Sequence, residues 1–198
     1  MTSNASEQRS AINWRVVGWG AAGLILLLPL VAMRLTDEVN WTASDFLFAG
    51  LLLGSVGLIL ELAVRRTTDR TYRAAVGCAV AAAFLVIWSN GAVGIVGSEN
   101  NDANALFNLV PLIALLGSLV ARFRAPGLAR VMLGTAMIQV LVTVIVLAVG
   151  WSERASIWPR EFLYSAGGFG GLWLASAWLF RRSANNQEGG RSAPQRSS

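Results

Sequence analysis

The sequence predicts an all-α membrane protein, a polytopic bundle of six transmembrane helices. Of its 198 residues 55% are hydrophobic and only 14% are charged, whereas a soluble domain has about 25% charged residues. The apolar residues fall in six runs of about 17 to 24 residues, each long enough to cross the hydrocarbon core of a bilayer as a helix. The runs lack the polar–apolar alternation of membrane strands. Composition and run length therefore agree on the fold class.

The first span, 16–33, lies between Arg15 and Arg34. A signal peptide is the alternative for this segment, but its apolar stretch is long and Val31-Ala32-Met33 is a poor cleavage site. We therefore expect a retained helix. Charged or amide residues bound the other spans, which are 46–64, 74–96, 105–121, 131–151 and 162–180.

The polar ends of the chain, 1–13 and 183–198, have the composition of disordered segments and should flank a six-helix domain over 14–182. Cytoplasmic loops of membrane proteins are rich in arginine and lysine. If the N-terminus is cytoplasmic, only three of the 16 arginines lie on the outer side, namely Arg34, Arg154 and Arg160. This distribution predicts that both termini are cytoplasmic, as an even number of spans requires.

Missing residue types exclude several kinds of chemistry. The chain has no His, all 16 basic residues are Arg, and Cys78 is the one cysteine. His-ligated haem, zinc or copper sites, Lys Schiff bases, internal disulfides and self-contained iron–sulfur sites are therefore excluded. The sequence also shows no nucleophile–base arrangement and no phosphate-binding loop. We expect a non-enzymatic protein with no cofactor, no metal site and no nucleic-acid partner.

Glu61 is the ionisable residue that lies clearly inside a span. A charge at the bilayer centre costs at least about 2.5 kcal/mol, so such a residue is by default a functional candidate. However, Glu61 lies about one turn from the cytoplasmic end of its span, four residues before Arg65. We favour an ion pair between these two residues, and proton coupling or ligand binding is the alternative.

The fifth span carries a second set of polar residues. Thr135, Gln139 and Thr143 have i, i+4, i+8 spacing and share one helix face near mid-membrane. The Gln139 amide needs a partner across the bundle, for which Asn90 and Asn108 are candidates. Interhelical hydrogen bonding is the favoured interpretation of this polar seam, and a solute path is the alternative.

Small residues recur at the spacing that lets membrane helices approach closely, in the pairs Gly50–Gly54, Gly167–Gly171 and Gly171–Ala175. We favour packing within the chain, with a homodimer face as the alternative. The polar loop 97–104 contains Glu99 and Asp102, whose carboxylates are oxygen ligands of the kind that divalent cations prefer. A turn followed by an Asp or Asn helix cap is the favoured interpretation of this loop.

Several short motifs resemble those of a family of short, uncharacterised multi-pass proteins of bacterial inner membranes. The resemblance covers about residues 40 to 180 and is carried by 40–46 (NWTASDF), 61–63 (ELA), 72–73 (YR), 97–104 (GSENNDAN), 121–124 (ARFR) and 128–130 (LAR). It implies a multi-pass architecture and an inner-membrane location. It implies no activity, because none is attached to the family.

These observations predict an integral membrane protein of the bacterial inner membrane without enzymatic activity, whose surroundings are lipid. Its expected role is that of an accessory or partner subunit that packs against other membrane subunits, or against a second copy, through its Gly-rich helix faces. The alternative is a small transporter or channel that uses Glu61, Asn90 and Gln139.

Overall fold

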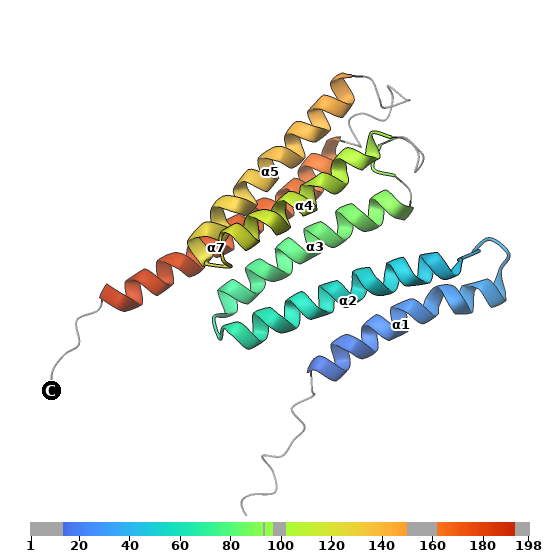
Figure 1. Cartoon of the computed structure of the whole chain (residues 1–198), viewed down its shortest axis with the longest axis horizontal. Coiled ribbons are helices and arrows are strands. Elements are labelled where there is room, and N and C mark those ends of the chain that lie inside the picture. The colour runs from blue at the N-terminus through green and yellow to red at the C-terminus, as the bar shows by residue number, and fades with distance from the viewer. Residues whose placement is uncertain (1–13, 93, 97–101, 150–161, 193–198) are drawn as a thin grey trace, which may run out of the picture. The chain divides into compact units, whose positions relative to one another are not determined.

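The computed structural model describes residues 14–92, 94–96, 102–149 and 162–192. All regular structure in these ranges is helical, as the sequence predicts (Figure 1). The helices are α1 (Trp14–Leu35), α2 (Ala43–Arg66), α3 (Arg70–Ala92), α4 (Asn104–Val120), α5 (Ala125–Ala148), the π-helical η1 (Leu163–Phe169) and α7 (Gly170–Ser192). The chain divides into two compact units, Met1–Leu62 and Ala63–Ser198. Each unit is described separately below.

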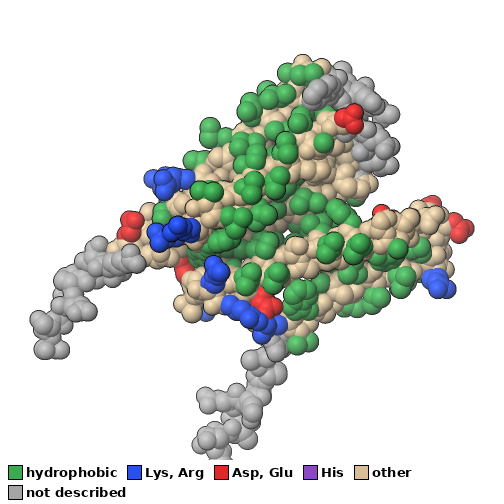
Figure 2. Space-filling model, in the orientation of Figure 1, with side chains coloured by type: hydrophobic (Ala, Val, Ile, Leu, Met, Phe, Trp, Pro, Cys, Tyr) green, Lys and Arg blue, Asp and Glu red, His purple; other side chains and the backbone are tan. Residues whose placement is uncertain are grey.

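Four of these helices, α1, α2, α3 and α5, are long and apolar enough to cross a membrane, and α4 is a shorter apolar helix. Many large hydrophobic side chains are exposed, and hydrophobic side chains on the face shown in Figure 2 are green. A soluble protein rarely exposes apolar patches on this scale. The helices therefore indicate a membrane protein.

In the first unit, none of the residues in the most apolar part of α1 is buried. Its large side chains, such as Leu24 and Leu28, are mostly exposed. One close approach links α1 to α2: a Cβ built at Gly57 would lie 3.0 Å from the indole of Trp19. Gly57 is therefore the residue that lets this indole lie against the backbone of α2.

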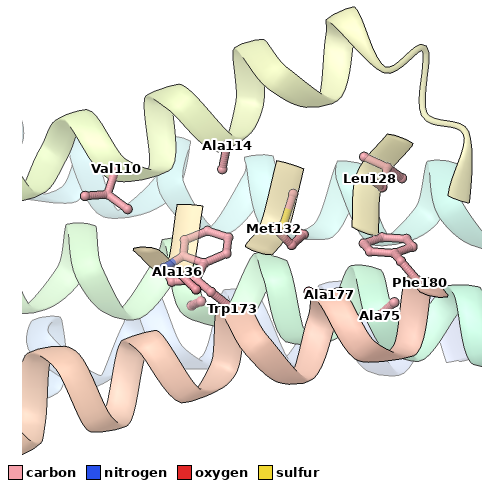
Figure 3. Close-up of a cluster of buried hydrophobic side chains, with 10 residues drawn as sticks. Ala75, Val110, Ala114, Leu128, Met132, Ala136, Trp173, Ala177 and Phe180 are labelled. Carbon is pink, nitrogen blue, oxygen red and sulfur yellow. The ribbon is translucent and has the colours of Figure 1, made fainter. Parts of the chain in front are cut away.

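The second unit is built on α3, α4, α5 and α7, and Figure 3 shows its main hydrophobic cluster. The largest side chains of this cluster come from α7: Trp173 lies beside Ala136, and Phe180 lies beside Leu128. A second cluster lies near the ends of α3 and α5 and consists of Val86, Ile95, Val96, Ala103, Phe107, Val146 and Phe169. Small residues on α3, such as Ala82, leave room for the large ones on its neighbours.

The turn between α4 and α5 has a left-handed backbone without glycine. Arg122 and Phe123 have φ angles of 51° and 56°, a conformation that costs roughly 1 kcal/mol or more per non-glycine residue. The Phe123 N–H donates to the Ser118 carbonyl at 3.1 Å, which closes the helix end in the manner of a Schellman motif. The Tyr72 hydroxyl donates to the Phe123 carbonyl at 2.8 Å. These hydrogen bonds offset the strain of the turn.

The turn between α2 and α3 is held by charged side chains. Arg73 donates to the carbonyls of Thr67 and Val64 at 2.8 and 2.9 Å, which satisfies backbone acceptors at the end of α2. The carboxylate of Asp69 accepts from the Thr71 N–H at 2.8 Å, so Asp69 caps the start of α3.

The C-terminal part of the chain differs from the sequence prediction. The stretch 183–198 has the composition of a disordered tail, yet α7 continues to Ser192, and residues 193–198 lie outside the described residues. The reason is a tertiary contact, because the Ser183 hydroxyl is buried and donates to the carboxylate of Asp69. The neighbouring Ala184 is buried as well. This docking extends the helix past the apolar residues that end at Phe180.

The Asp69–Ser183 contact predicts a pH dependence. The hydrogen bond from Ser183 is the largest influence that lowers the pKa of Asp69 below its ordinary value. A depressed pKa stabilises the fold above the unfolded-state pKa of about 4, and this contribution is lost as the pH falls through the folded-state value. We expect Ser183→Ala to raise the pKa of Asp69, which NMR titration of its carboxyl carbon would measure. A pKa unchanged by Ser183→Ala would contradict this assignment.

Candidate functional site

The candidate residues fall into three separate groups, two in the second unit and one in the first, and the largest group is on α5. Thr135, Gln139 and Thr143 share one face of the helix, as their spacing predicts, and each is at most 1% exposed. The Thr135 hydroxyl donates to the carbonyl of Val131 in its own helix at 2.9 Å. Gln139 and Thr143 instead reach across to the η1 segment.

Gln139, Thr143 and Ser165 form a closed ring of hydrogen bonds. The Gln139 amide nitrogen donates to the Ser165 hydroxyl at 3.0 Å, and the Thr143 hydroxyl donates to the Gln139 backbone carbonyl at 2.8 Å. Because the single Thr143 proton is used in this way, the 2.8 Å contact between the two hydroxyls requires Ser165 to donate to Thr143. Each hydroxyl thus donates once and accepts once, and the ring fixes η1 to α5.

Ser165 is the member of this ring that sequence reasoning misses. It lies on η1, where the wider π-helical turn buries Ser165, Ala166 and Phe169 and leaves Gly167 and Gly168 exposed. π-Helical turns are rare and are found frequently at functional sites. The sequence gives only a weak signal for it, a serine followed by small residues in an otherwise apolar run.

Three buried side-chain atoms have no hydrogen-bond partner among the described residues, namely Gln139 Oε1 in this ring, Trp173 Nε1 and Asn90 Oδ1. The Gln139 and Trp173 side chains are at most 1% exposed, and Asn90 is 7% exposed. An unpaired buried polar group costs about 1–3 kcal/mol. Each of these three atoms is therefore an unsatisfied polar group in the interior of the second unit.

The sequence offers Asn90 as a candidate partner of Gln139. In the structure Asn90 instead belongs to a separate group. Its amide nitrogen donates to the Asn104 carbonyl at 2.6 Å and to the Asn108 side chain at 2.9 Å. The Asn104 side chain accepts from the N–H groups of Ile95 and Val96 at 2.9 and 3.0 Å. Asn104 thus holds the end of the α3–α4 connection, while Ala103 occupies the helix cap position without a side-chain hydrogen bond. The expected Asp or Asn cap is therefore wrong.

Glu61 has an ion-pair partner that its spacing does not reveal. Its carboxylate pairs with the guanidinium of Arg15, 46 residues earlier on α1, and the Trp19 indole N–H approaches the second oxygen at 3.4 Å. The Glu61 side chain is 11% exposed and that of Arg15 is 46% exposed. The sequence predicts Arg65 as the partner, from the same helix. The structure adds a cation from α1, so the pair links two helices of the first unit.

The loop 97–104 contains two further candidate residues, Glu99 and Asp102. Asp102 is exposed, and Glu99 lies outside the described residues. Among the described residues no group of three or more His, Cys, Asp or Glu side chains could hold a metal ion. Comparison with known proteins adds no further constraint, because no family model, curated protein or solved structure matches the chain.

The hydrogen-bond ring predicts an asymmetry between its members. Ser165→Ala leaves the Gln139 amide buried without its partner and should lower stability by about 1–2 kcal/mol. Gln139→Leu removes the amide together with its unpaired oxygen, so its effect should stay within about 1 kcal/mol. Unfolding of the purified protein in mixed micelles measures both.

Ser118→Ala is the matched control, because Ser118 is buried but bonds its own helix at the Ala114 carbonyl. This control should be close to neutral. A Gln139→Leu loss larger than that of Ser165→Ala would contradict the proposed ring.

Proposed function

We propose that the protein is a non-enzymatic, six-span protein of the bacterial inner membrane, with both termini cytoplasmic, that serves as an accessory subunit. Its helix faces would pack against helices of another membrane protein. The four membrane-length helices support insertion into a bilayer. The arginine distribution supports the orientation.

The observation that carries the partner role is the open glycine face of η1 and α7. A Cβ built at Gly167, Gly168 or Gly171 would meet no atom of the described second unit within 4 Å. The sequence favours packing of Gly167 and Gly171 within the chain. Among the described residues of the second unit, no helix packs closely against these two glycines. Lipid gives no hydrophobic driving force for association, so a smooth glycine surface favours close approach of another helix.

The interior polar groups support the same proposal. Gln139, Thr143 and Ser165 are engaged with one another, and so are Asn90 and Asn108. A solute path would instead need such groups to face a water-filled space. Their hydrogen bonds are of the kind that hold membrane helices together.

Affinity purification from membranes in mild detergent tests the partner role. A tagged wild-type chain should retain a membrane protein in a fixed ratio, and Gly167→Leu/Gly171→Leu should lose it because two large side chains roughen the face. Gly77→Leu on α3, which also meets open space, is the matched control. Equal recovery with all three chains, or no membrane partner at all, would contradict the proposal.

A transport role is the second candidate, and the unpaired Gln139 Oε1 and Trp173 Nε1 favour it. Such atoms are free to bind a small polar solute or water. Osmotic swelling of vesicles that contain the purified protein tests this role. Flux that Gln139→Leu abolishes at unchanged stability would replace the subunit proposal, and flux equal to that of empty vesicles would remove this candidate.

A further inference from the structure

A groove on the surface of the second unit runs between α5 and α7, near the start of α5 and the end of the apolar part of α7. It holds about 590 Å³, which is within the usual range for small-molecule sites. The apolar part of its lining, called the floor below, includes Leu133, Leu174 and Ala177. The charged residues of the lining are Arg130, Arg181 and Glu188.

The charges of the groove are arranged asymmetrically. The Nε of Arg130 donates to the Pro126 carbonyl at 3.4 Å, which holds this side chain at the groove. Arg182 is not part of the groove lining, but its guanidinium lies 5.5 Å from the ring centroid of Trp178, which is. Glu188 also lines the groove, but seven residues beyond Arg181 it lies about 10 Å farther along the helix. The part of the groove nearest the apolar floor therefore has a net positive charge.

An apolar track continues from the floor along α5. Leu133, Met137 and Leu141 are spaced four residues apart, and each is about half or more exposed. Residues at this spacing lie on one helix face. The groove thus combines a cationic end with a long apolar surface, and the two are contiguous.

We propose that this groove binds one diacyl phospholipid with an anionic headgroup. The phosphate lies between Arg130 and Arg181, the glycerol region lies against Trp178, and an acyl chain follows the track on α5. A free phosphate or a soluble anion would leave the apolar floor unused, and a zwitterionic lipid would add a cation next to the arginines. Basic pockets between membrane helices bind anionic headgroups in this way. The groove lining contains neither Gly167 nor Gly171, so this proposal and the partner role rest on different residues.

Native mass spectrometry of the full chain in detergent tests the proposal. The wild-type protein should retain phosphatidylglycerol in preference to phosphatidylcholine. Arg130→Gln/Arg181→Gln should weaken retention by about tenfold or more, since each arginine near a headgroup is worth about 1 kcal/mol. Arg70→Gln/Arg124→Gln, which removes two exposed arginines outside the groove lining, is the matched control and should retain the lipid.

Leu133→Trp provides a second variant with every arginine in place. It fills the floor of the groove and should also weaken retention, while the unfolding temperature in detergent shows that the variant is folded. Inorganic phosphate at the same concentration should not displace the lipid. Equal retention of the two lipids, unchanged retention in Arg130→Gln/Arg181→Gln, or displacement by phosphate would each overturn the proposal.

Discussion

Replacing Arg15 with Gln is expected to destabilise the α1–α2 pair by about 2 kcal/mol or more, because it leaves the buried Glu61 carboxylate without its cation from α1. Because Arg15 is about half exposed, this loss of stability should be smaller than the 3–5 kcal/mol that breaking a fully buried pair costs. Arg15→Gln/Glu61→Gln should recover much of the loss, since removing both charges leaves no isolated one. Unfolding of the full chain in mixed micelles measures all three variants.

The sequence-predicted partner is tested by a parallel double-mutant cycle on Glu61→Gln and Arg65→Gln. We expect the coupling energy of Glu61 to be larger with Arg15 than with Arg65. Arg34→Gln, at the opposite end of α1, is the control and should have little effect. Zero coupling between Glu61 and Arg15 would show that the carboxylate has another task and would restore proton coupling as the leading interpretation of this residue.

Trp173→Ala is expected to have the largest effect of any single substitution proposed for the second unit, a loss of about 3–5 kcal/mol. The indole is 1% exposed and lies in the main hydrophobic cluster beside Ala136 (Figure 3). Trp173→Phe should cost far less, because it keeps most of the ring and removes the unpaired N–H.

Trp178→Ala is the matched control for this pair of variants. Trp178 lies on the same helix, is 59% exposed, and should tolerate truncation in the unfolding assay. A Trp173→Phe loss close to that of Trp173→Ala would mean that the indole nitrogen has a strong partner. That outcome would favour a bound solute or water at the Trp173 nitrogen.

Helix positions in this chain could be predicted closely from the sequence. The expected span 46–64 lies inside α2, and 105–121 matches α4 within one residue at each end. The physical reason is that a bilayer leaves backbone groups no partner but their own helix, so run length and apolarity decide the outcome locally. Four of the described helices have the length and apolarity needed to cross a membrane. The arrangement with six spans is the proposal made above.

The side-chain partners could not be predicted from the sequence, because they depend on packing between distant segments. Arg15 and Glu61 are 46 residues apart, and Gln139 and Ser165 are 26 apart. Ser183 and Asp69 are separated by 114 residues, which is why a polar tail continues as an ordered helix. In each case the residue type is informative, since a buried polar group needs a partner, but the sequence does not identify that partner.

The six-span arrangement with cytoplasmic termini is the central claim, and cysteine accessibility in intact cells tests it most directly. Single cysteines would be placed, in a Cys78→Ser background, at Glu38, Asp102 and Ser156 and at Thr68 and Asn186, with Ser156 lying outside the described residues. An impermeant thiol reagent should label the first three and leave Thr68 and Asn186 protected until the membrane is permeabilised. Labelling of Asn186 in intact cells would contradict the sixth span, and labelling of Thr68 with protection of the first three would reverse the orientation.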